Sequence, residues 1–343
     1  MYQLDFNEFD REVYEKELKS FLPEKMVDCH VHLKVASFGP LKNRPPVPKE
    51  TAPKWTSLSP KEMTIEDMNY AFKQLFPDQE VTPLVFGGCG HDLTEVNTYV
   101  AETKKKYGYP TLYRSSYDMP LDELEENVIK NGHFGLKPYL NQRPIYIPGN
   151  ETRIFDFLPK EQLELANKHG WTIMLHIPRS GRLKDKVNIA QLLEIEEKYP
   201  NVKLIVAHIG RAYSKEDIGD AFEFLGKTKN MLFDFTANLC EDAIKACIEA
   251  VGCKRLMFGS DLPIAFLRLY RVTENGHYMN VVPKGYYGDI TGMSEIREEE
   301  NDKITLMIYE QLRVFKQCAM ELKLSDTDVE DILYGNAARL LKL

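Results

Sequence analysis

The chain has 343 residues, with 44 Lys and Arg against 52 Asp and Glu, and a formal net charge of −8 at pH 7. This acidic balance argues against nucleic acid or an anionic membrane as the main partner. No apolar stretch approaches the roughly 18 residues that a membrane span needs, and the acidic amino terminus is unlike a signal peptide. The six cysteines form no C-x-x-C pair and fit reduced thiols, so we expect a cytoplasmic protein.

The predicted elements begin with an N-terminal arm, residues 1–23, whose acidic pattern over 6–22 indicates a helix. Eight short apolar segments follow and are typical of buried strands: 26–32, 80–88, 110–116, 134–140, 172–178, 204–210, 231–237 and 255–263. Amphipathic helical patterns lie between most of them. This alternation predicts an α/β fold, a (β/α)8 TIM barrel over 24–343. We expect a single domain over 1–343, since no stretch after the arm reads as a linker.

A barrel of this type takes about 250 residues, so the chain carries extra segments. A Pro-rich insertion, 39–55, follows the first strand, and a long loop, about 264–300, follows the eighth. Both leave from carboxyl ends of strands, where barrel active sites are built, so we expect them to wall or cover the site. A doubly wound open sheet is the alternative, but the glycine-rich turn at 87–91 lacks the G-x-G-x-x-G spacing of a nucleotide site.

Histidines and an aspartate stand where four of these strands end. His30 and His32 are two residues apart, so on an extended strand their side chains leave the same face. Burying two polar rings on one face of a strand costs free energy unless a partner binds them. His176 and His208 hold equivalent positions on the fifth and sixth strands, and Asp261 lies near the end of the eighth. Three or four imidazoles with one carboxylate predict a site for zinc or a similar divalent ion.

Two aspartates need separate interpretation. Asp261 precedes Leu262-Pro263 and in the simplest case would be an N-cap for the next helix. Beside a divalent ion, which lowers the pKa of bound water to about 7, it would instead be a ligand and the general base and acid. Asp28, two residues before His30, is predicted to orient a ligand histidine.

Three cationic residues also lie near the predicted strand ends. Lys137, on the fourth strand, is predicted to lie in the mouth of the site, either as a carbamylated lysine between two metals or as a cation for an acidic substrate. A surface lysine is the simpler alternative. Arg179 and Arg211 each follow a histidine by three residues. Turned inward, they would bind a substrate carboxylate in bidentate fashion; turned outward, they are surface charges.

Taken in strand order, these residues resemble those of the amidohydrolase superfamily of metal-dependent barrel enzymes. The matching positions are Asp28, His30, His32, His176, His208 and Asp261. Two stretches bring the likeness closer to the amidohydrolase-related branch, which also contains the aminocarboxymuconate semialdehyde decarboxylase group. They are RLMFGSDLP at 255–263 and ILYGNAARLLKL at 332–343, which is similar to the family's closing helix.

The resemblance implies one metal ion held by His30, His32, His176 and Asp261, with His208 contacting a second ion or polarising the substrate. Zinc is the first expectation, manganese, iron and cobalt are alternatives, and a second ion is left open. Members of the superfamily hydrolyse amides, lactones and related bonds, or decarboxylate aromatic and unsaturated acids.

The leading hypothesis is a metal-dependent hydrolase of a small, acidic molecule. The ion would activate water, Asp261 would take its proton and return it to the leaving group, and His208 would help to polarise the carbonyl. A nonoxidative decarboxylase with the same metal is the alternative, and an arginine facing the metal in a flat apolar slot would favour it. A catalytically silent barrel with a structural ion is the third hypothesis. Association into a homo-oligomer is left open.

Overall fold

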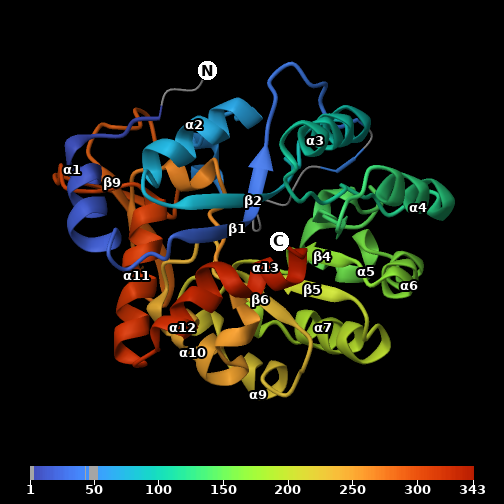
Figure 1. Ribbon diagram of the computed structural model, residues 1–343. Helices are drawn as coiled ribbons and strands as arrows, with labels where there is room; N and C mark the ends of the chain where they lie inside the picture. The colour runs from blue at the N-terminus through green and yellow to red at the C-terminus, as the bar shows by residue number, and fades with distance from the viewer. Residues whose placement is uncertain (1–3, 43, 46–52) are drawn as a thin grey trace.

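A parallel sheet of five strands lies near the centre of the molecule (Figure 1). The computed structural model describes residues 4–42, 44–45 and 53–343. The five strands pair in chain order: β3 (Gly135–Leu136), β4 (Thr172–Leu175), β5 (Lys203–Val206), β6 (Leu232–Asp234) and β7 (Leu256–Met257). Two longer strands, β1 (Lys25–Leu33) and β2 (Glu80–Gly87), form a parallel pair of their own. The predicted α/β fold with a parallel sheet is confirmed.

Single parallel bridges connect the pair to the sheet on the β2 side. Thr111 bridges Val85 of β2, and Tyr113 bridges Leu136 of β3. The strand predicted over 110–116 is therefore represented in the described chain by these two bridges. Backbone hydrogen bonds support them, since the Tyr113 N–H donates to the Gly135 carbonyl at 2.8 Å.

On its other side, β1 pairs with the segment that follows β7. Val31 bridges Leu262 in parallel, and the Cys29 N–H donates to the Phe258 carbonyl at 3.0 Å. The pairing of β1 with β2 shifts register between Asp28 and Val31. Because of this irregularity, strict alternation of side chains between the two faces does not hold across this part of β1.

Helices cover the outside of the strands (Figure 1). Their bounds are α2 (Ile65–Leu75), α3 (Leu93–Tyr107), α4 (Leu121–Lys130), α5 (Ile154–Phe157), α6 (Lys160–His169), α7 (Lys186–Lys198), α8 (His208–Arg211), α9 (Ala221–Leu225), α10 (Glu241–Val251), α11 (Met307–Glu321), α12 (Asp326–Glu330) and α13 (Asn336–Leu341). Helix α6 ends at Gly170, a left-handed C-cap that glycine adopts without strain. Among the described residues, no helix combines the length and the apolar character that a membrane span requires.

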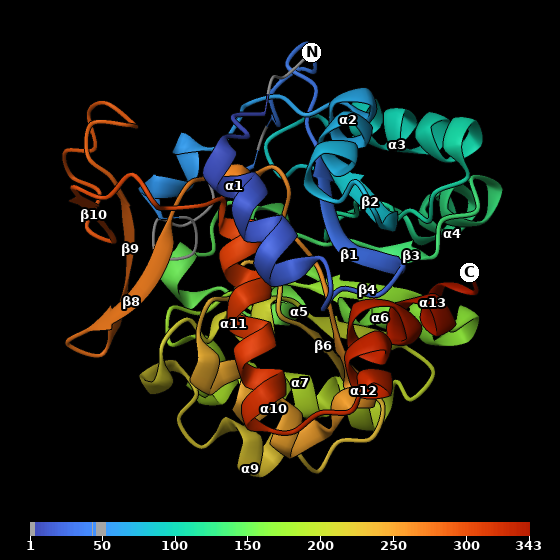
Figure 2. The same cartoon turned by 60° about the vertical axis from the view of Figure 1, so that its left-hand side comes forward.

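The N-terminal arm is helical, as predicted, and packs against α11 (Figure 2). It consists of α1 (Glu8–Val13) and a π-helical turn over Tyr14–Leu18. A buried ion pair anchors it: Arg268 donates to the two carboxylate oxygens of Asp10 at 2.9 and 2.8 Å. Because Arg268 belongs to the segment after β7, this pair connects the start of the chain to one of the extra segments.

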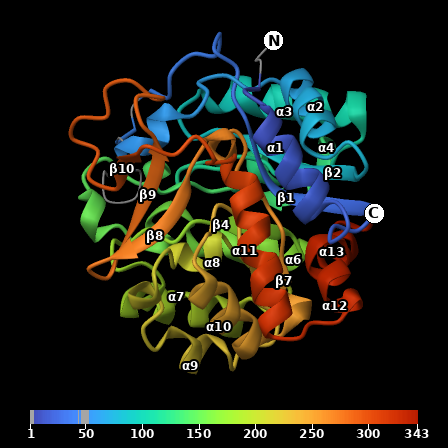
Figure 3. The same cartoon turned by 90° about the vertical axis from the view of Figure 1, so that its left-hand side faces the viewer.

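The segment after β7 is more ordered than the loop predicted from the sequence. It contains three short strands, which Figure 3 shows as a separate small sheet: β8 (Tyr270–Glu274), β9 (His277–Pro283) and β10 (Ile296–Glu299). Strands β8 and β9 are a hairpin joined by Asn275 and Gly276, whose φ angles of 52° and 77° suit a two-residue turn. Of the Pro-rich insertion, residues 43 and 46–52 lie outside the described residues.

Replacing Asp10 by Asn is expected to lower the free energy of unfolding by about 3–5 kcal/mol, because it removes the buried partner of a buried guanidinium. Urea denaturation measures the change. Glu12→Gln is the matched control, since the ion pair of Glu12 with Lys16 is exposed and such pairs contribute little to stability. Equal losses in the two variants would contradict an anchoring role for Asp10.

Candidate active site

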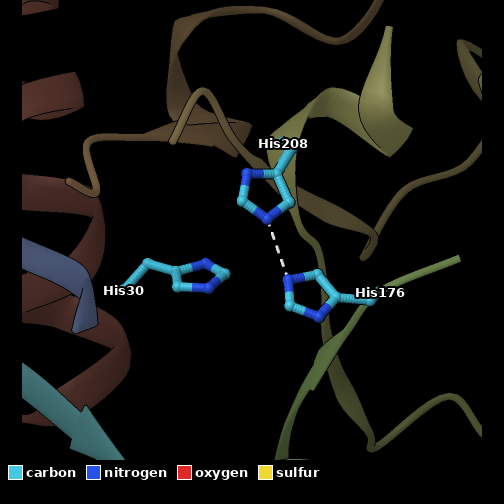
Figure 4. Close-up of side chains that lie close together, drawn as sticks. All are labelled: His30, His176 and His208. Carbon is cyan, nitrogen blue, oxygen red and sulfur yellow. Dashed lines mark hydrogen bonds between the residues drawn. The ribbon is translucent and has the colours of Figure 1, made fainter. Parts of the chain in front are cut away.

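Three of the predicted histidines meet where strands β1, β4 and β5 end, as Figure 4 shows. The Nε2 atoms of His176 and His208 are 2.8 Å apart, and the two rings stack at 12°. The ring centroid of His30 lies 5.3 Å from that of His176 and 4.9 Å from that of His208. One ligand atom from each of the three falls within 4.8 Å of the others, a spacing that could hold a metal ion.

A second group shares His30 with the first. His32 Nε2 lies 2.8 Å from Asp261 Oδ1, and His30 Nε2 lies 3.7 Å from the same oxygen. The structure thus brings together His30, His32, His176, His208 and Asp261 in one buried or half-buried cluster. Asp261 does not cap the following helix, because that 3-10 helix begins at Ile264 with Pro263 as its N-cap.

The donor atoms of this cluster fit a divalent ion. His30 Nε2 is buried and has no hydrogen-bond partner among the described residues, while its Nδ1 donates to Asp234 Oδ2 at 3.1 Å. The Nε2 lone pair therefore faces the cluster. The Nε2 atoms of His176 and His208 lie 2.8 Å apart. Two ring nitrogens so close together repel each other unless a proton or a cation lies between their lone pairs. Nitrogen and carboxylate ligands of this kind suit zinc, manganese or a similar ion.

Three histidines of the cluster, His30, His32 and His176, are held neutral, which metal binding requires. Burial lowers the pKa of His32 to about 4, although the bond to Asp261 opposes the change. Burial, and then the nearby Lys137 ammonium, lower the pKa of His30 and His176 well below the usual range. At neutral pH their lone pairs are thus available to an ion.

The sequence reasoning missed Asp234, which closes strand β6 and orients the cluster. Its Oδ2 accepts from His30 Nδ1, and its Oδ1 accepts from the His208 N–H at 2.7 Å and the Thr236 N–H at 3.1 Å. That role was predicted for Asp28, which contacts the backbone of His30 and not its ring. Asp28 Oδ1 accepts from the backbone N–H groups of His30 and Ser260, next to the register shift in β1. The acidic residue within the apolar segment 231–237 was the available signal.

Tyr139 was also missed, and it orients His32. Its hydroxyl lies 2.8 Å from His32 Nδ1 and 3.2 Å from the Gly87 carbonyl, to which it can donate. The hydroxyl oxygen can then accept from an Nδ1–H of His32, leaving Nε2 as the ligand atom. Burial raises the pKa of Tyr139 well above its usual range, so the phenol stays protonated.

The backbone at two of these residues is strained. His208, Ile209, Gly210 and Arg211 follow one another with φ angles of 58°, 48°, 59° and 60°, and Asp261 has a φ of 64°. The left-handed conformation costs about 1–2 kcal/mol for each non-glycine residue. Such strain is typical of functional sites. Here the left-handed turn of α8 brings both His208 and Arg211 to the lining of one cavity.

That cavity has a volume of about 230 Å³ and opens onto the cluster. His32, His176, His208 and Asp261 line one part of it. Cationic and aromatic side chains line much of the rest: Lys34, Arg182, Arg211, Arg271, Trp55, Tyr139, Tyr213 and Tyr278. Trp55 comes from the Pro-rich insertion, and Arg271 and Tyr278 come from the small sheet, so both extra segments wall the site.

Arg179 and Arg211, which were predicted to share a role in substrate binding, lie in different surroundings. Arg211 is buried and lines the cavity. Arg179 is not among the lining residues, because its Nε donates to both carboxylate oxygens of Asp185, the N-cap of α7, at 3.1 and 3.0 Å. The structure therefore does not bear out Arg179 as a substrate ligand. Arg182, three residues further along, lines the cavity instead.

Lys137 is completely buried, which rules out the surface alternative. Its Nζ lies 4.8 Å from the ring centroid of Phe86 and 5.2 Å from that of Tyr139, and no hydrogen-bond partner exists among the described residues. Burial lowers the pKa of Lys137 to about 7. The side chain can therefore be neutral near physiological pH.

A family model described as amidohydrolase matches residues 27–343. The chain belongs to the amidohydrolase family. Among solved structures, a probable 2-pyrone-4,6-dicarboxylic acid hydrolase from Acinetobacter baumannii, with citric acid bound, is 15% identical with a TM-score of 0.58. The match covers 93% of this chain and 99% of that one. No curated protein matches the chain in a sequence search.

Two further structures of this fold contain metal ions. An amidohydrolase from Burkholderia multivorans with bound zinc is 12% identical, with a TM-score of 0.59, over 93% of this chain and 99% of that one. A dihydroxybenzoic acid decarboxylase from Polaromonas sp. JS666 with bound manganese and the inhibitor 2-nitroresorcinol is 15% identical, with a TM-score of 0.55, over 94% and 98%. At these identities the likeness shows the fold alone. Hydrolases and decarboxylases both use it.

Replacing Asp234 by Asn is expected to weaken Zn²⁺ binding by about 10- to 100-fold, because hydrogen-bonded partners of ligand histidines tune metal affinity to that extent. Competition with a chelator of known affinity measures the change. Asp302→Asn, at an exposed position, is the control and should bind zinc like the wild type. An unchanged affinity in Asp234→Asn would show that the cluster does not depend on this carboxylate.

The metal-free protein is expected to lose stability as the pH falls from about 6.5 toward 4. Over this range the unfolded chain protonates its histidines, whereas His30, His32 and His176 stay neutral in the folded state. Each contributes a slope of up to about 1.4 kcal/mol per pH unit. Urea denaturation in a chelator at pH 7 and pH 5 measures it. The free energy of unfolding should depend less steeply on pH in His32→Gln than in the wild type. In His277→Gln, at an exposed position, the dependence should be unchanged.

Proposed function

We propose that this protein is a metal-dependent hydrolase that cleaves an amide, lactone or related bond of a small acidic molecule. The observation that carries this proposal is the position of Asp261, an aspartate that both belongs to the metal-capable cluster and lines the cavity. Burial alone would raise its pKa, but the contact of its Oδ1 with His32 Nε2 and the neighbouring imidazoles hold that pKa below its usual range. The carboxylate is thus ready to accept a proton.

We also infer that the strands close into a (β/α)8 barrel. The bridges at Thr111 and Tyr113 join β2 to β3, and the pairing of Val31 with Leu262 returns the sheet to β1. In a closed barrel, all strands end at one rim, and active sites are built there. The convergence of residues from β1, β4, β5 and the segment after β7 supports this inference.

His30, His32, His176 and Asp261 would hold the ion, and His208 lies beside them. A divalent ion supplies Lewis acidity, which polarises a carbonyl and makes water more acidic. His208 Nδ1 donates to the Thr236 carbonyl at 2.7 Å, so Nε2 of the neutral ring is an acceptor. A neutral His208 therefore cannot donate a hydrogen bond to the substrate from Nε2.

In the hydrolytic step, Asp261 accepts a proton from the attacking water and returns it to the leaving group as the scissile bond breaks. Arg211 and Lys34, which line the cavity, provide positive charge for a carboxylate of the substrate. The aromatic rings of the cavity exclude water and contact the apolar part of the molecule. The cavity beside the cluster also argues against an ion with a purely structural role.

A nonoxidative decarboxylase is the second candidate, favoured by Arg211 at the cavity beside His208 and by the aromatic walls. In this reaction the carbon–carbon bond to the substrate carboxylate breaks, carbon dioxide leaves, and a proton joins the ring or alkene carbon. Asp261 would take the proton of the substrate's acid group and deliver it to that carbon. The same cluster serves both reactions, so the products distinguish them.

Asp261→Asn is expected to lower kcat by about 10²- to 10⁴-fold, because an amide cannot accept the proton. Zn²⁺- and Mn²⁺-loaded protein is assayed against carboxylated lactones and amides by product chromatography, and against dihydroxybenzoates by carbon dioxide release. Asp302→Asn is the matched control. Hydrolysis supports the leading proposal, and carbon dioxide release replaces it with the second candidate. Full activity of Asp261→Asn would overturn the role of this residue.

A further inference from the structure

A completely buried arginine, Arg114, holds the loop that follows β2. Its guanidinium donates to three backbone carbonyls of this loop: that of Gly88, that of His91 at 3.2 Å and that of Cys89 at 3.4 Å. Among the described residues, no carboxylate lies within 4.0 Å of this guanidinium. The loop carbonyls, and not a counter-ion, are therefore the acceptors that Arg114 binds.

Arg114 is itself fixed by the helix that follows the same loop. Asn97 of α3 donates from Nδ2 to the Arg114 carbonyl at 3.0 Å, and its Oδ1 accepts from the Arg114 N–H at 2.9 Å. A second amide, that of Asn141, donates to the Cys89 carbonyl at 3.0 Å. Buried groups that are paired on this scale have little freedom to move. The guanidinium therefore has a fixed position relative to the loop.

The same guanidinium contacts Tyr139, the residue that orients His32. The central carbon of the Arg114 guanidinium lies 5.0 Å from the ring centroid of Tyr139, within the range of a cation–π contact. The hydroxyl of this ring lies 2.8 Å from His32 Nδ1 and 3.2 Å from the Gly87 carbonyl. Gly87 directly precedes the loop residues that Arg114 binds. Arg114 thus contacts both the ring of Tyr139 and the loop beside the acceptor of its hydroxyl.

The loop is also bound to the end of the strand that carries His32. The Gly88 N–H donates to the Leu33 carbonyl at 3.0 Å, while the Gly88 carbonyl accepts from Arg114. Because Leu33 follows His32 directly, a displacement of this loop would shift His32 relative to the hydroxyl of Tyr139. The orientation of one ligand histidine therefore depends on contacts that Arg114 makes.

We propose that Arg114 is a positioning residue for the metal site, which holds Tyr139 and the loop after β2 so that His32 presents Nε2 to the ion. Arg114 is not among the described residues that line the cavity, so its effect passes through Tyr139 and the loop. Arginine suits this role because its rigid, planar guanidinium donates to several acceptors and stacks on a ring at the same time. The proposal rests on the proposed function only in taking His32 as a ligand.

A double-mutant cycle on Zn²⁺ affinity tests this role without any turnover. The affinity is measured by competition with a chelator in the full-length wild type, in Arg114→Gln, in Tyr139→Phe and in the double variant. Each single variant is expected to bind Zn²⁺ about 10- to 100-fold more weakly than the wild type. The double variant should bind about as weakly as Tyr139→Phe, because both changes remove the same support of His32.

The visible spectrum of the Co²⁺-loaded protein is a second readout, because it responds to the arrangement of the ligands around the ion. It should change in the same direction in Arg114→Gln and in Tyr139→Phe. Arg255→Gln is the matched control, since Arg255 also donates to a backbone carbonyl, that of Val251, but lies at the amino end of β7. This control should be less stable than the wild type and retain its Zn²⁺ affinity and Co²⁺ spectrum.

Thermal melting identifies variants that do not fold. If Arg114→Gln is one of them, Arg114→Lys takes its place in the cycle, because it keeps the charge and loses the planar fork. Wild-type Zn²⁺ affinity in the folded Arg114 variant, or additive losses in the double variant, would overturn the proposal. A wild type that does not bind Zn²⁺ would overturn it together with the proposed function. A coupled loss of affinity without turnover of any substrate would count against the proposed function alone.

Discussion

The contact between Asp234 and His30 is the one on which the arrangement of the site depends. One carboxylate at the end of β6 receives hydrogen bonds from the ring of His30 and from the backbone N–H of His208. It therefore ties β1 and the turn after β5 to a third strand. Because the carboxylate fixes the proton on Nδ1 of His30, Nε2 is left as a lone pair inside the protein. A buried acceptor of this kind is stable only if a proton or a cation completes it.

Electrostatic forces divide the cavity into two regions with different requirements. At the cluster, imidazoles are kept neutral by burial and one carboxylate is kept ionised, a combination that suits a divalent cation. Beside Tyr213 and Tyr278, the guanidinium of Arg271 is a permanent cation that the aromatic rings contact but cannot neutralise. The two regions of the cavity therefore differ in charge.

The small sheet of β8, β9 and β10 contributes side chains to the cavity beside the histidine cluster. It is inserted after β7, and the ion pair of Arg268 with Asp10 ties its base to the N-terminal arm. The hairpin brings Arg271 and Tyr278 to the same wall, since they lie on its paired strands. Strands place such side chains more rigidly than a loop would, because their backbone hydrogen bonds are satisfied within the sheet.

The sequence by itself determined the alternation of strands and helices, the meeting of His30, His32, His176, His208 and Asp261, and the acidic character of the chain. Those features follow from local periodicity and from the rule that parallel strands end on the same side. The strands of the inserted segment escaped notice, although an Asn-Gly turn between β-forming residues marks the hairpin.

Only the tertiary structure decided which side chains complete the site. Asp234, and not Asp28, contacts the ring of His30. Arg179 is paired with Asp185, whereas Arg182 lines the cavity. The sequence did not show whether Lys137 lies inside the protein or on its surface, and the structure shows that it is buried. Each of these outcomes depends on contacts between segments far apart in the chain, and local sequence patterns carry no information about such contacts.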